Sequence, residues 1–293
     1  RQWRSCALPP RRWRSTCRAI PRASHAPAEA YEKDGAVCFR SCIEPNFIDL
    51  VARAVSENRE NPGIGFEYLV AEGGEGGFWN DYCNWRQIKG FHEFLRNSGI
   101  ASIARSLLPG GNAHFYHEHV LVKEKGSLKE TPWHQDQPYY PFDGPLLSLW
   151  MPLDSVSKET TLKFVKGSHM WGEFIPRKFE TEMEYTPIRP VCESYQHIPR
   201  DISSQSTKYE IISWAAEPGD IIAFNGRTIH GAKGNSGEGP RRVVSWRFLG
   251  DDAILVERPW DISPPTTGDL EWGQRLGETS SRHFPRLHSA GYL

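Results

Sequence analysis

The sequence has no apolar run long enough to span a lipid bilayer and no excess of charge of one sign. Its mean hydropathy is −0.57, which argues against a membrane-spanning chain. The 35 Lys and Arg residues nearly balance the 36 Asp and Glu residues, and the formal net charge is −1. That balance does not indicate a nucleic acid or a membrane surface as a partner.

Cysteine is also scarce, and its spacing excludes two classes of small scaffold. No two of the six cysteines are separated by exactly two residues, so they fit neither a disulfide framework nor a zinc site. We expect reduced, mostly buried thiols and therefore an intracellular protein. The six are Cys6, Cys17, Cys38, Cys42, Cys83 and Cys192.

The N-terminal stretch differs in composition from the rest of the chain. Residues 1–28 hold seven Arg and no acidic residue, which leaves 28 basic and 36 acidic residues in the remainder. This Arg-rich, Ser-containing segment resembles an organelle transit peptide, which would direct the protein to mitochondria. Because the first residue is Arg, an incorrectly assigned start or an upstream fragment explains it equally well, and the protein would then be cytoplasmic. We treat residues 1–28 as a leader and residues 29–293 as a single domain.

Aromatic residues are abundant, at 12% of the chain with 11 Trp, which favours a well-packed core. Apolar residues recur at helical spacing over 47–55 and 100–108. From about residue 113 the pattern changes to alternation, which is typical of strands. Many short strands after helices predict a mainly β fold with flanking N-terminal helices, either a jelly roll or a double-sheet barrel. The expected strands cover residues 115–122, 146–153, 161–165, 211–215, 220–224 and 241–249.

The strongest group of candidate site residues begins with His134 and Asp136. In an extended segment, side chains two residues apart point to the same face, so both can converge on one atom. A third ligand is available in His230, which follows the expected strand 220–224. Two imidazoles and one carboxylate form the facial triad of non-haem Fe(II) oxygenases. Taken alone, the pair at 134 and 136 fits a His–Asp hydrogen bond in a loop better than a metal site.

Arg241 strengthens the case for a metal site. It opens the expected strand 241–249, and alternation places Val243, Ser245 and Arg247 on its face while Arg242 points the other way. A guanidinium inside a barrel is costly unless it meets an anion, and its shape suits a carboxylate. A dicarboxylic co-substrate that chelates iron at one end needs such a partner at the other. The alternative is that Arg241 and Arg242 both face solvent in a loop.

Four segments together resemble the phytanoyl-CoA dioxygenase family. Its members are Fe(II)- and 2-oxoglutarate-dependent oxygenases on a double-stranded β-helix. The segments, in order, are Trp-His-Gln-Asp at 133–136, Phe-Val-Lys-Gly-Ser-His at 164–169, Pro-Gly-Asp with Phe224 at 218–224, and His-Gly with Asn235 and Arg-Arg at 230–242. The resemblance covers roughly residues 30–255. Lys166 stands where the family often has proline, which affects a turn, and His169 is not expected to be a ligand.

The resemblance implies a role for each matching residue. His134, Asp136 and His230 would bind Fe(II), and Arg241 would hold the distal carboxylate of 2-oxoglutarate. Trp150 occupies a position where the family can place an aromatic beside 2-oxoglutarate. The implied reaction is hydroxylation of a small organic or acyl substrate by O₂, with release of succinate and CO₂. The presence of Asp136 argues against the halogenating variation, which replaces this carboxylate by a small residue.

Two other functions are consistent with the sequence. His117, His119 and Glu124, together with His230, match much of a cupin metal motif, which would give a metalloenzyme independent of 2-oxoglutarate. That hypothesis leaves His134, Asp136 and Arg241 unexplained. The other alternative is a non-catalytic ligand-binding barrel. The partner in each case is a small molecule, and the sequence does not reveal the oligomeric state.

Several features have a structural and a functional interpretation. The glycine-rich stretch 73–77 lacks the Gly-Lys-Ser/Thr of a phosphate loop, which leaves an active-site flap or a plain connector, and we favour the connector. Whether Lys123 or Arg247 reaches a substrate anion is not decided by the sequence, and an acyl-CoA substrate does not follow from the family name.

Two groups of aromatic residues could line a pocket, although core packing is expected for most of their members. They are Tyr139, Tyr140 and Phe142, and Phe78, Trp79, Tyr82 and Trp85.

Overall fold

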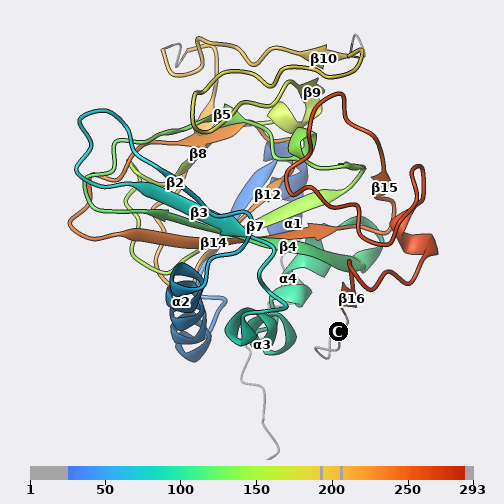
Figure 1. Cartoon of the computed structure of the whole chain (residues 1–293), viewed down its shortest axis with the longest axis horizontal. Helices are drawn as coiled ribbons and strands as arrows, with labels where there is room; N and C mark the ends of the chain where they lie inside the picture. The colour runs from blue at the N-terminus through green and yellow to red at the C-terminus, as the bar shows by residue number, and fades with distance from the viewer. Residues whose placement is uncertain (1–25, 192–193, 205–206, 288–293) are drawn as a thin grey trace, which may run out of the picture.

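Two β-sheets face each other across the middle of the protein, and helices cover the outer face of the larger one (Figure 1). The computed structural model describes residues 26–191, 194–204 and 207–287. Within these ranges no helix is long and apolar enough to cross a membrane. The helices are α1 (Ala26–Asp34), α2 (Pro45–Glu60), α3 (Lys89–Asn97) and α4 (Ile100–Leu107), with 3-10 turns at Pro109–Gly111, Gln137–Tyr139, Ser168–Met170 and Leu276–Glu278.

The larger sheet has eight strands, and each neighbouring pair in it is antiparallel. Their order across the sheet is β1 (Ala36–Phe39), β12 (Ile221–Asn225), β7 (Leu146–Pro152), β14 (Arg241–Leu249), β4 (Ala113–Lys123), β3 (Phe78–Tyr82) and β2 (Glu67–Leu69), with β16 (Arg286–Leu287) also paired to β4.

The smaller sheet lies opposite and has four strands in the order β11 (Ile211–Ile212), β8 (Leu162–Val165), β13 (His230–Ala232) and β5 (Thr131–His134). Strands far apart in the sequence alternate across both sheets, which is the arrangement of a double-stranded β-helix, or jelly roll. The predicted fold class is therefore confirmed. Two further strand pairs lie outside the sheets: β6 (Phe142–Asp143) with β15 (Ile254–Leu255), and β9 (Glu173–Phe174) with β10 (Tyr195–Gln196).

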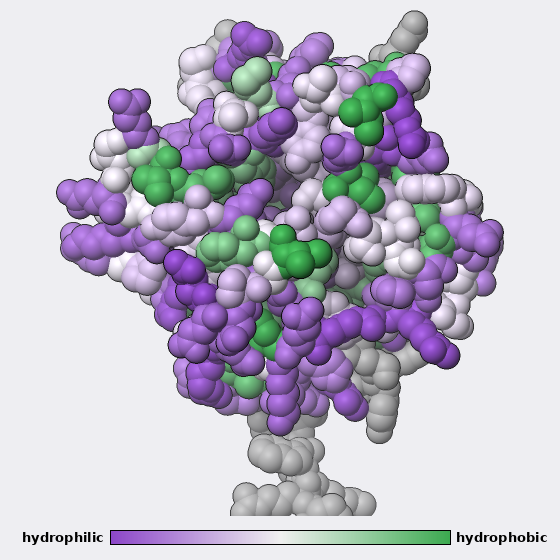
Figure 2. Space-filling view, in the orientation of Figure 1, coloured by the Kyte–Doolittle hydropathy of each residue, from purple (hydrophilic) through white to green (hydrophobic). Residues whose placement is uncertain are grey.

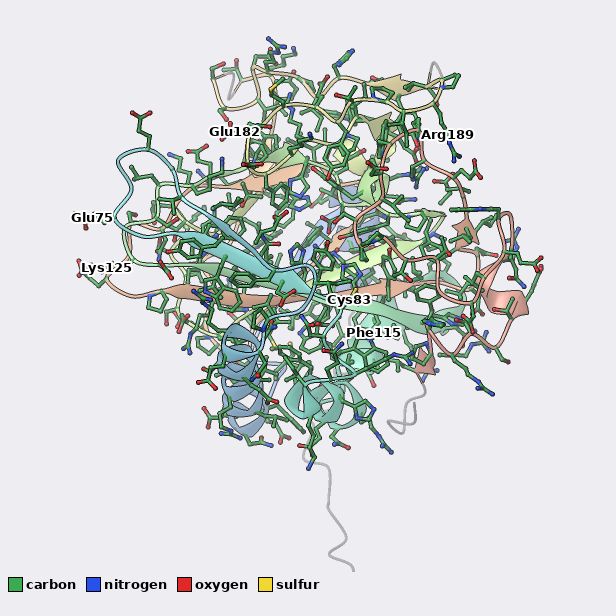
Figure 3. All side chains as sticks on the ribbon, viewed as in Figure 1. Glu75, Cys83, Phe115, Lys125, Glu182 and Arg189 are labelled. Carbon is green, nitrogen blue, oxygen red and sulfur yellow. The ribbon has the colours of Figure 1, made fainter. Side chains whose placement is uncertain are left out.

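The main hydrophobic core lies between the larger sheet and helices α2, α3 and α4. Its centre is Trp246, which is fully buried and stacks on Phe94 of α3 with ring centroids 4.6 Å apart. Phe91 approaches the same indole edge-on, and Phe115, the one of the two that is labelled in Figure 3, approaches it at a tilt. Aromatic pairs in these geometries each contribute about 0.5–1.5 kcal/mol beyond their buried area. These contacts fix the helices against the sheet.

Strand β14 has two chemically different faces. Val244, Trp246 and Phe248 belong to the core under the helices, whereas Arg241, Ser245 and Arg247 line the cavity between the sheets. This is the alternation predicted from the sequence. Because β14 is paired on both sides, to β4 and to β7, its register is fixed by two ladders of backbone hydrogen bonds.

Most predicted strands are confirmed, with shifts of one or two residues at their ends. The largest difference concerns the expected strand 211–215, of which only Ile211 and Ile212 form strand β11. This strand is at the edge of the smaller sheet and pairs with β8 alone. The sequence did not predict helices α1 and α3 or the strands β1, β2, β3, β6, β9, β10, β13, β15 and β16. Residues 1–25, most of the expected leader, lie outside the described residues, and α1 begins at Ala26. Cys38, Cys42 and Cys83 are unpaired, and Cys6, Cys17 and Cys192 lie outside the described residues.

Candidate active site

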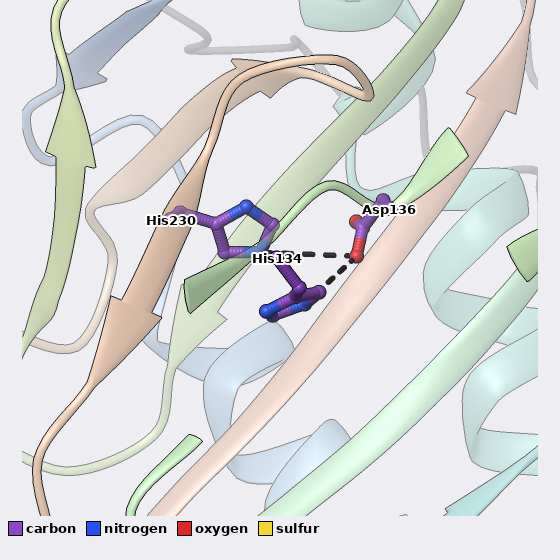
Figure 4. A group of neighbouring side chains, drawn as sticks. All are labelled: His134, Asp136 and His230. Atoms are coloured by element: carbon purple, nitrogen blue, oxygen red, sulfur yellow. Dashed lines mark ion pairs between the residues drawn. The ribbon is translucent and has the colours of Figure 1, made fainter. Parts of the chain in front are cut away.

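His134, Asp136 and His230 come together between the two sheets (Figure 4). His134 ends β5 and His230 begins β13, and the two residues are directly paired across these antiparallel strands. The Nε2 atoms of the imidazoles lie 3.5 and 3.7 Å from the Asp136 Oδ1 atom. All three side chains are buried. Within the described residues, no other group of three or more His, Cys, Asp or Glu side chains could hold a metal ion.

The backbone fixes which nitrogen of each imidazole is available. Nδ1 of His134 lies 2.8 Å from the carbonyl oxygen of Pro132, and Nδ1 of His230 lies 2.9 Å from that of Thr228. A carbonyl only accepts, so each Nδ1 carries the proton and each Nε2 presents a lone pair to the centre. Burial lowers the pKa of His230 to about 3, which keeps it in the neutral form that binds metals.

Asp136 is held as a carboxylate by two partners. Ser148 of β7 donates a hydrogen bond of 2.7 Å to Oδ2, and Nη2 of Arg247 lies 3.2 Å from the same oxygen. Burial alone would raise the pKa of Asp136, but the positive charge of Arg247 holds it well below its usual range. The other oxygen, Oδ1, faces the two imidazoles.

Gln135 lies between His134 and Asp136, points away from them and holds the segment after β5 in place through hydrogen bonds. Its amide nitrogen donates to the carbonyl oxygens of Gly172 and Arg227, and its amide oxygen accepts from the backbone of Phe174. These contacts anchor the turn after β5, so that His134 and Asp136 on either side face inward.

Arg241 is a buried cation without an anion. It is 8% exposed, its Nη1 donates to the carbonyl of Thr160, and its Nε has no hydrogen-bond partner. Burial lowers its pKa to about 10, and no nearby acid opposes that shift. An unpaired buried guanidinium is destabilising, so the side chain fits a site whose anion comes from a ligand.

A cavity of about 550 Å³ joins these groups. It is lined by His134, Asp136, His230, Arg241 and Trp150, and by further aromatic and polar side chains. The further ones include Asn80, Tyr82, Tyr139, Tyr140, Phe179 and Tyr185. Hydrophilic side chains cover most of the molecular face seen in Figure 2, and the apolar ones form small separate patches.

The cupin motif does not assemble into a metal group. His117 and His119 line the same cavity, and Nε2 of His119 lies 3.0 Å from the amide oxygen of Asn80. Glu124, however, accepts hydrogen bonds from Tyr68 and from the backbone of Gly77 at the β2–β3 loop. The alternation explains this result, because Glu124 lies seven positions after His117 and five after His119, and an odd offset along an extended chain points to the opposite face.

Arg247 and Lys123 both have partners within the protein. Arg247 is paired with Asp136. Lys123 donates to the carbonyl oxygens of Lys233 and Ala232, at 2.8 and 3.4 Å. Sequence reasoning missed Ser148, whose signal is a lone hydroxyl in the otherwise apolar strand β7, and it missed the segment 177–188 that borders the cavity.

The remaining sequence features are mostly structural. The glycine-rich stretch 73–77 is the β2–β3 connection and does not line the cavity, and Glu75 within it lies at the periphery (Figure 3). Asn235 donates to the carbonyl oxygens of Lys123, Glu124 and Gly239. His169 contacts the carbonyl of Glu32.

The two aromatic groups are divided between cavity and core. Phe78, Tyr82, Tyr139 and Tyr140 line the cavity. Trp79 and Trp85 belong to the main core, and Phe142 belongs to a smaller hydrophobic cluster. Tyr139 and Tyr140 belong to that smaller cluster as well as to the cavity wall, so five of the seven side chains pack in hydrophobic clusters, as expected for most of them.

Comparison with known sequences gives one family. The family model described as phytanoyl-CoA dioxygenase (PhyH) matches residues 31–243. A curated relative from Caenorhabditis elegans, "Probable phytanoyl-CoA dioxygenase", is 25% identical over 168 residues. That match covers 55% of this chain and 51% of the relative, about half of its length.

Solved structures share the fold at low sequence identity. The non-heme alpha ketoglutarate dependent epimerase SnoN from nogalamycin biosynthesis is 20% identical with a TM-score of 0.68, over 89% of this chain and 94% of that one. SnoN has also been solved with Fe³⁺, alpha ketoglutarate and nogalamycin RO. EctD from S. alaskensis, solved with 2-oxoglutarate and 5-hydroxyectoine, is 18% identical with a TM-score of 0.61, over 87% of this chain and 86% of that one. At these identities the likeness establishes the fold.

Proposed function

Since the chain belongs to the phytanoyl-CoA dioxygenase family, we propose that it is an Fe(II)- and 2-oxoglutarate-dependent dioxygenase that hydroxylates a small organic or acyl substrate. One observation carries the proposal. A buried group of two neutral imidazoles and one carboxylate shares a cavity with a buried arginine that lacks an anion.

The donor set fits iron. Both Nε2 lone pairs and one oxygen of Asp136 face a common centre, and two nitrogens with one oxygen are the ligands of non-haem Fe(II) sites. His134, Asp136 and His230 would hold the metal, with positions left for further ligands. The bound metal would supply the oxidation by O₂ of 2-oxoglutarate to succinate and CO₂ and of a substrate C–H bond to an alcohol.

The cavity also fits 2-oxoglutarate. Arg241 has an unpartnered Nε and would bind the distal carboxylate, which would restore the charge balance that burial of the guanidinium upsets. Trp150 lies on β7 directly opposite Ser245 of β14 and lines the same cavity. Its indole would pack beside the co-substrate and keep water away from it.

The rest of the cavity would hold the substrate. Tyr82, Tyr139 and Tyr140 give it apolar walls with hydroxyl groups, and His117 and His119 add two imidazoles whose pKa values burial lowers. Neutral imidazoles and phenols offer hydrogen bonds but no positive charge to balance an anion. We therefore infer that the part of the substrate nearest the metal group is uncharged.

The test is an anaerobic titration of the metal-free chain with Fe(II) and 2-oxoglutarate, followed by the visible charge-transfer band of the chelate. We expect the band in the wild type, its loss in Asp136→Ala and its weakening in Arg241→Ala. Arg242→Ala is the matched control, because Arg242 faces outward and pairs with Asp154. Metal binding without the band, abolished by His117→Ala and unchanged in Asp136→Ala, would instead favour the cupin site. Absence of metal binding would favour a non-catalytic barrel.

A further inference from the structure

Three arginines of β14 differ in what they pair with. Arg242 faces outward and pairs with Asp154 at 2.6 Å. Arg241 faces the cavity and has only the Thr160 carbonyl as partner. Arg247 also faces the cavity, but it is paired with Asp136, the carboxylate of the candidate metal group. The proposed reaction explains Arg241, but it does not by itself explain Arg247.

The contacts of Asp136 are divided between its two oxygens. Oδ2 accepts a hydrogen bond from Ser148 and the ion pair from Arg247, at 2.7 and 3.2 Å. Oδ1 is the oxygen that faces His134 and His230. A carboxylate with two free oxygens can chelate a metal through both and occupy two coordination positions. With Oδ2 engaged by a cation and a hydroxyl, only Oδ1 is available.

The partners of Oδ2 are themselves firmly held. Arg247 and Ser148 are directly paired between β14 and β7 in the middle of the larger sheet. Nη1 of Arg247 donates to the carbonyl of Ser245 at 3.1 Å, and its guanidinium lies 5.7 Å from the ring centre of Tyr140. Both side chains are at most 4% exposed, so bulk water does not compete with them for Oδ2.

We propose that Arg247, together with Ser148, is a positioning residue that restricts Asp136 to a single ligand oxygen and so keeps coordination positions free for the co-substrate. This inference rests on the proposed function. It assigns different roles to the two cavity-facing arginines of β14: Arg241 binds the co-substrate, and Arg247 orients a metal ligand.

The test uses the full-length chain freed of metal and titrated with Co(II), whose visible absorption reports coordination number. We expect Arg247→Met to weaken Co(II) binding about 10- to 100-fold, the range typical when the partner of a metal ligand is lost, and to change the absorption bands. Ser148→Ala should have a smaller effect in the same direction. Arg247→Lys should recover part of the affinity and the wild-type bands, because it retains a cation near Oδ2. Arg242→Met is the matched control and should bind within about twofold of wild type.

Circular dichroism would show whether each variant is folded. If Arg247→Met does not fold, Ser148→Ala and Arg247→Lys still test the inference. Wild-type affinity and bands in the folded Arg247 and Ser148 variants, with loss of binding in Asp136→Ala, would overturn the inference and leave the proposed function standing. A wild-type chain that does not bind Co(II) at all would overturn both.

Discussion

His134 and His230 lie directly opposite each other on β5 and β13, with ring centroids 4.1 Å apart. The two strands belong to the smaller sheet, and β5 is its edge. A metal ion bound by both imidazoles would therefore join the edge strand to its neighbour through side chains as well as through the backbone.

Metal binding should therefore stabilise the folded chain. A ligand present at 100 times its dissociation constant adds about 2.7 kcal/mol to the free energy of unfolding, and about 2–4 °C of melting temperature accompanies each kcal/mol in a domain of roughly this size. We expect Mn(II) to raise the melting temperature by about 5–10 °C in a thermal denaturation assay and a chelator to reverse the shift. His134→Ala should abolish the shift and His119→Ala should retain it. Equal shifts in both variants would mean that the metal binds elsewhere.

Loss of the Arg241 side chain should weaken binding of 2-oxoglutarate. Removing one partner of a buried charge pair costs about 2–5 kcal/mol, and 1.4 kcal/mol corresponds to a factor of 10 in affinity. We expect Arg241→Ala to raise the Kd for 2-oxoglutarate at least 30-fold, measured by calorimetry with Mn(II) present. Arg242→Ala should leave this Kd unchanged. If Arg241→Ala binds 2-oxoglutarate like the wild type, another group holds the distal carboxylate.

Glu118 should make the stability of the protein fall between about pH 4.5 and pH 8. The side chain is fully buried, only one of its oxygens has a partner, and burial raises its pKa from 4.5 to about 8. Between these values the folded state holds a proton that the unfolded state has released, so raising the pH destabilises the folded state. Above pH 8 both states are ionised and the loss is complete.

Glu118→Gln removes this titration, so the melting temperature of the variant minus that of the wild type should grow by several degrees from pH 5 to pH 8 and then level off. Glu75→Gln, at an exposed glutamate of the β2–β3 loop, is the matched control. A Glu118→Gln difference that is constant with pH would show that this carboxyl group does not titrate in the range.

Truncation of Trp246 should destabilise the protein without altering the metal group. The indole packs against Phe94 and Phe91, on the face of β14 opposite the cavity. Replacing a buried tryptophan by alanine costs about 3–5 kcal/mol. We expect Trp246→Ala to lower the melting temperature by about 10 °C or more while the folded protein keeps its Co(II) affinity. Trp272→Ala, at a half-exposed tryptophan, should change the melting temperature by no more than a few degrees.

The sequence predicted the parts of the site that follow from local geometry. Alternation along an extended chain gives the shared face of His134 and Asp136 and the inward direction of Arg241. It does not give partners that lie on other strands. The hydrogen bond from Ser148 to Asp136 joins a central strand to a turn, and sequence spacing carries no information about which turn lies beside which strand.

The unpredicted elements have a similar explanation. Helix α3 is nine residues long, and its buried side chains, Phe91, Phe94 and Leu95, form too short a pattern to recognise without the sheet beneath them. Strand β3 has four consecutive buried residues, so it does not alternate. Such a run is ambiguous in isolation, because strands covered on both faces lose the pattern that identifies them.

The different chemistry of the two faces of β14 also disfavours a shift in the register of this strand. If the strand slipped by one residue relative to β4 and β7, Arg241 and Arg247 would enter the core beneath the helices, and Trp246 and Phe248 would enter the cavity. The slip would separate Arg247 from Asp136, its ion-pair partner in the native register, and bury the guanidinium among apolar side chains, which is costly. Arg247 therefore favours the native register of β14, and a variant that lacks it would lose that selection.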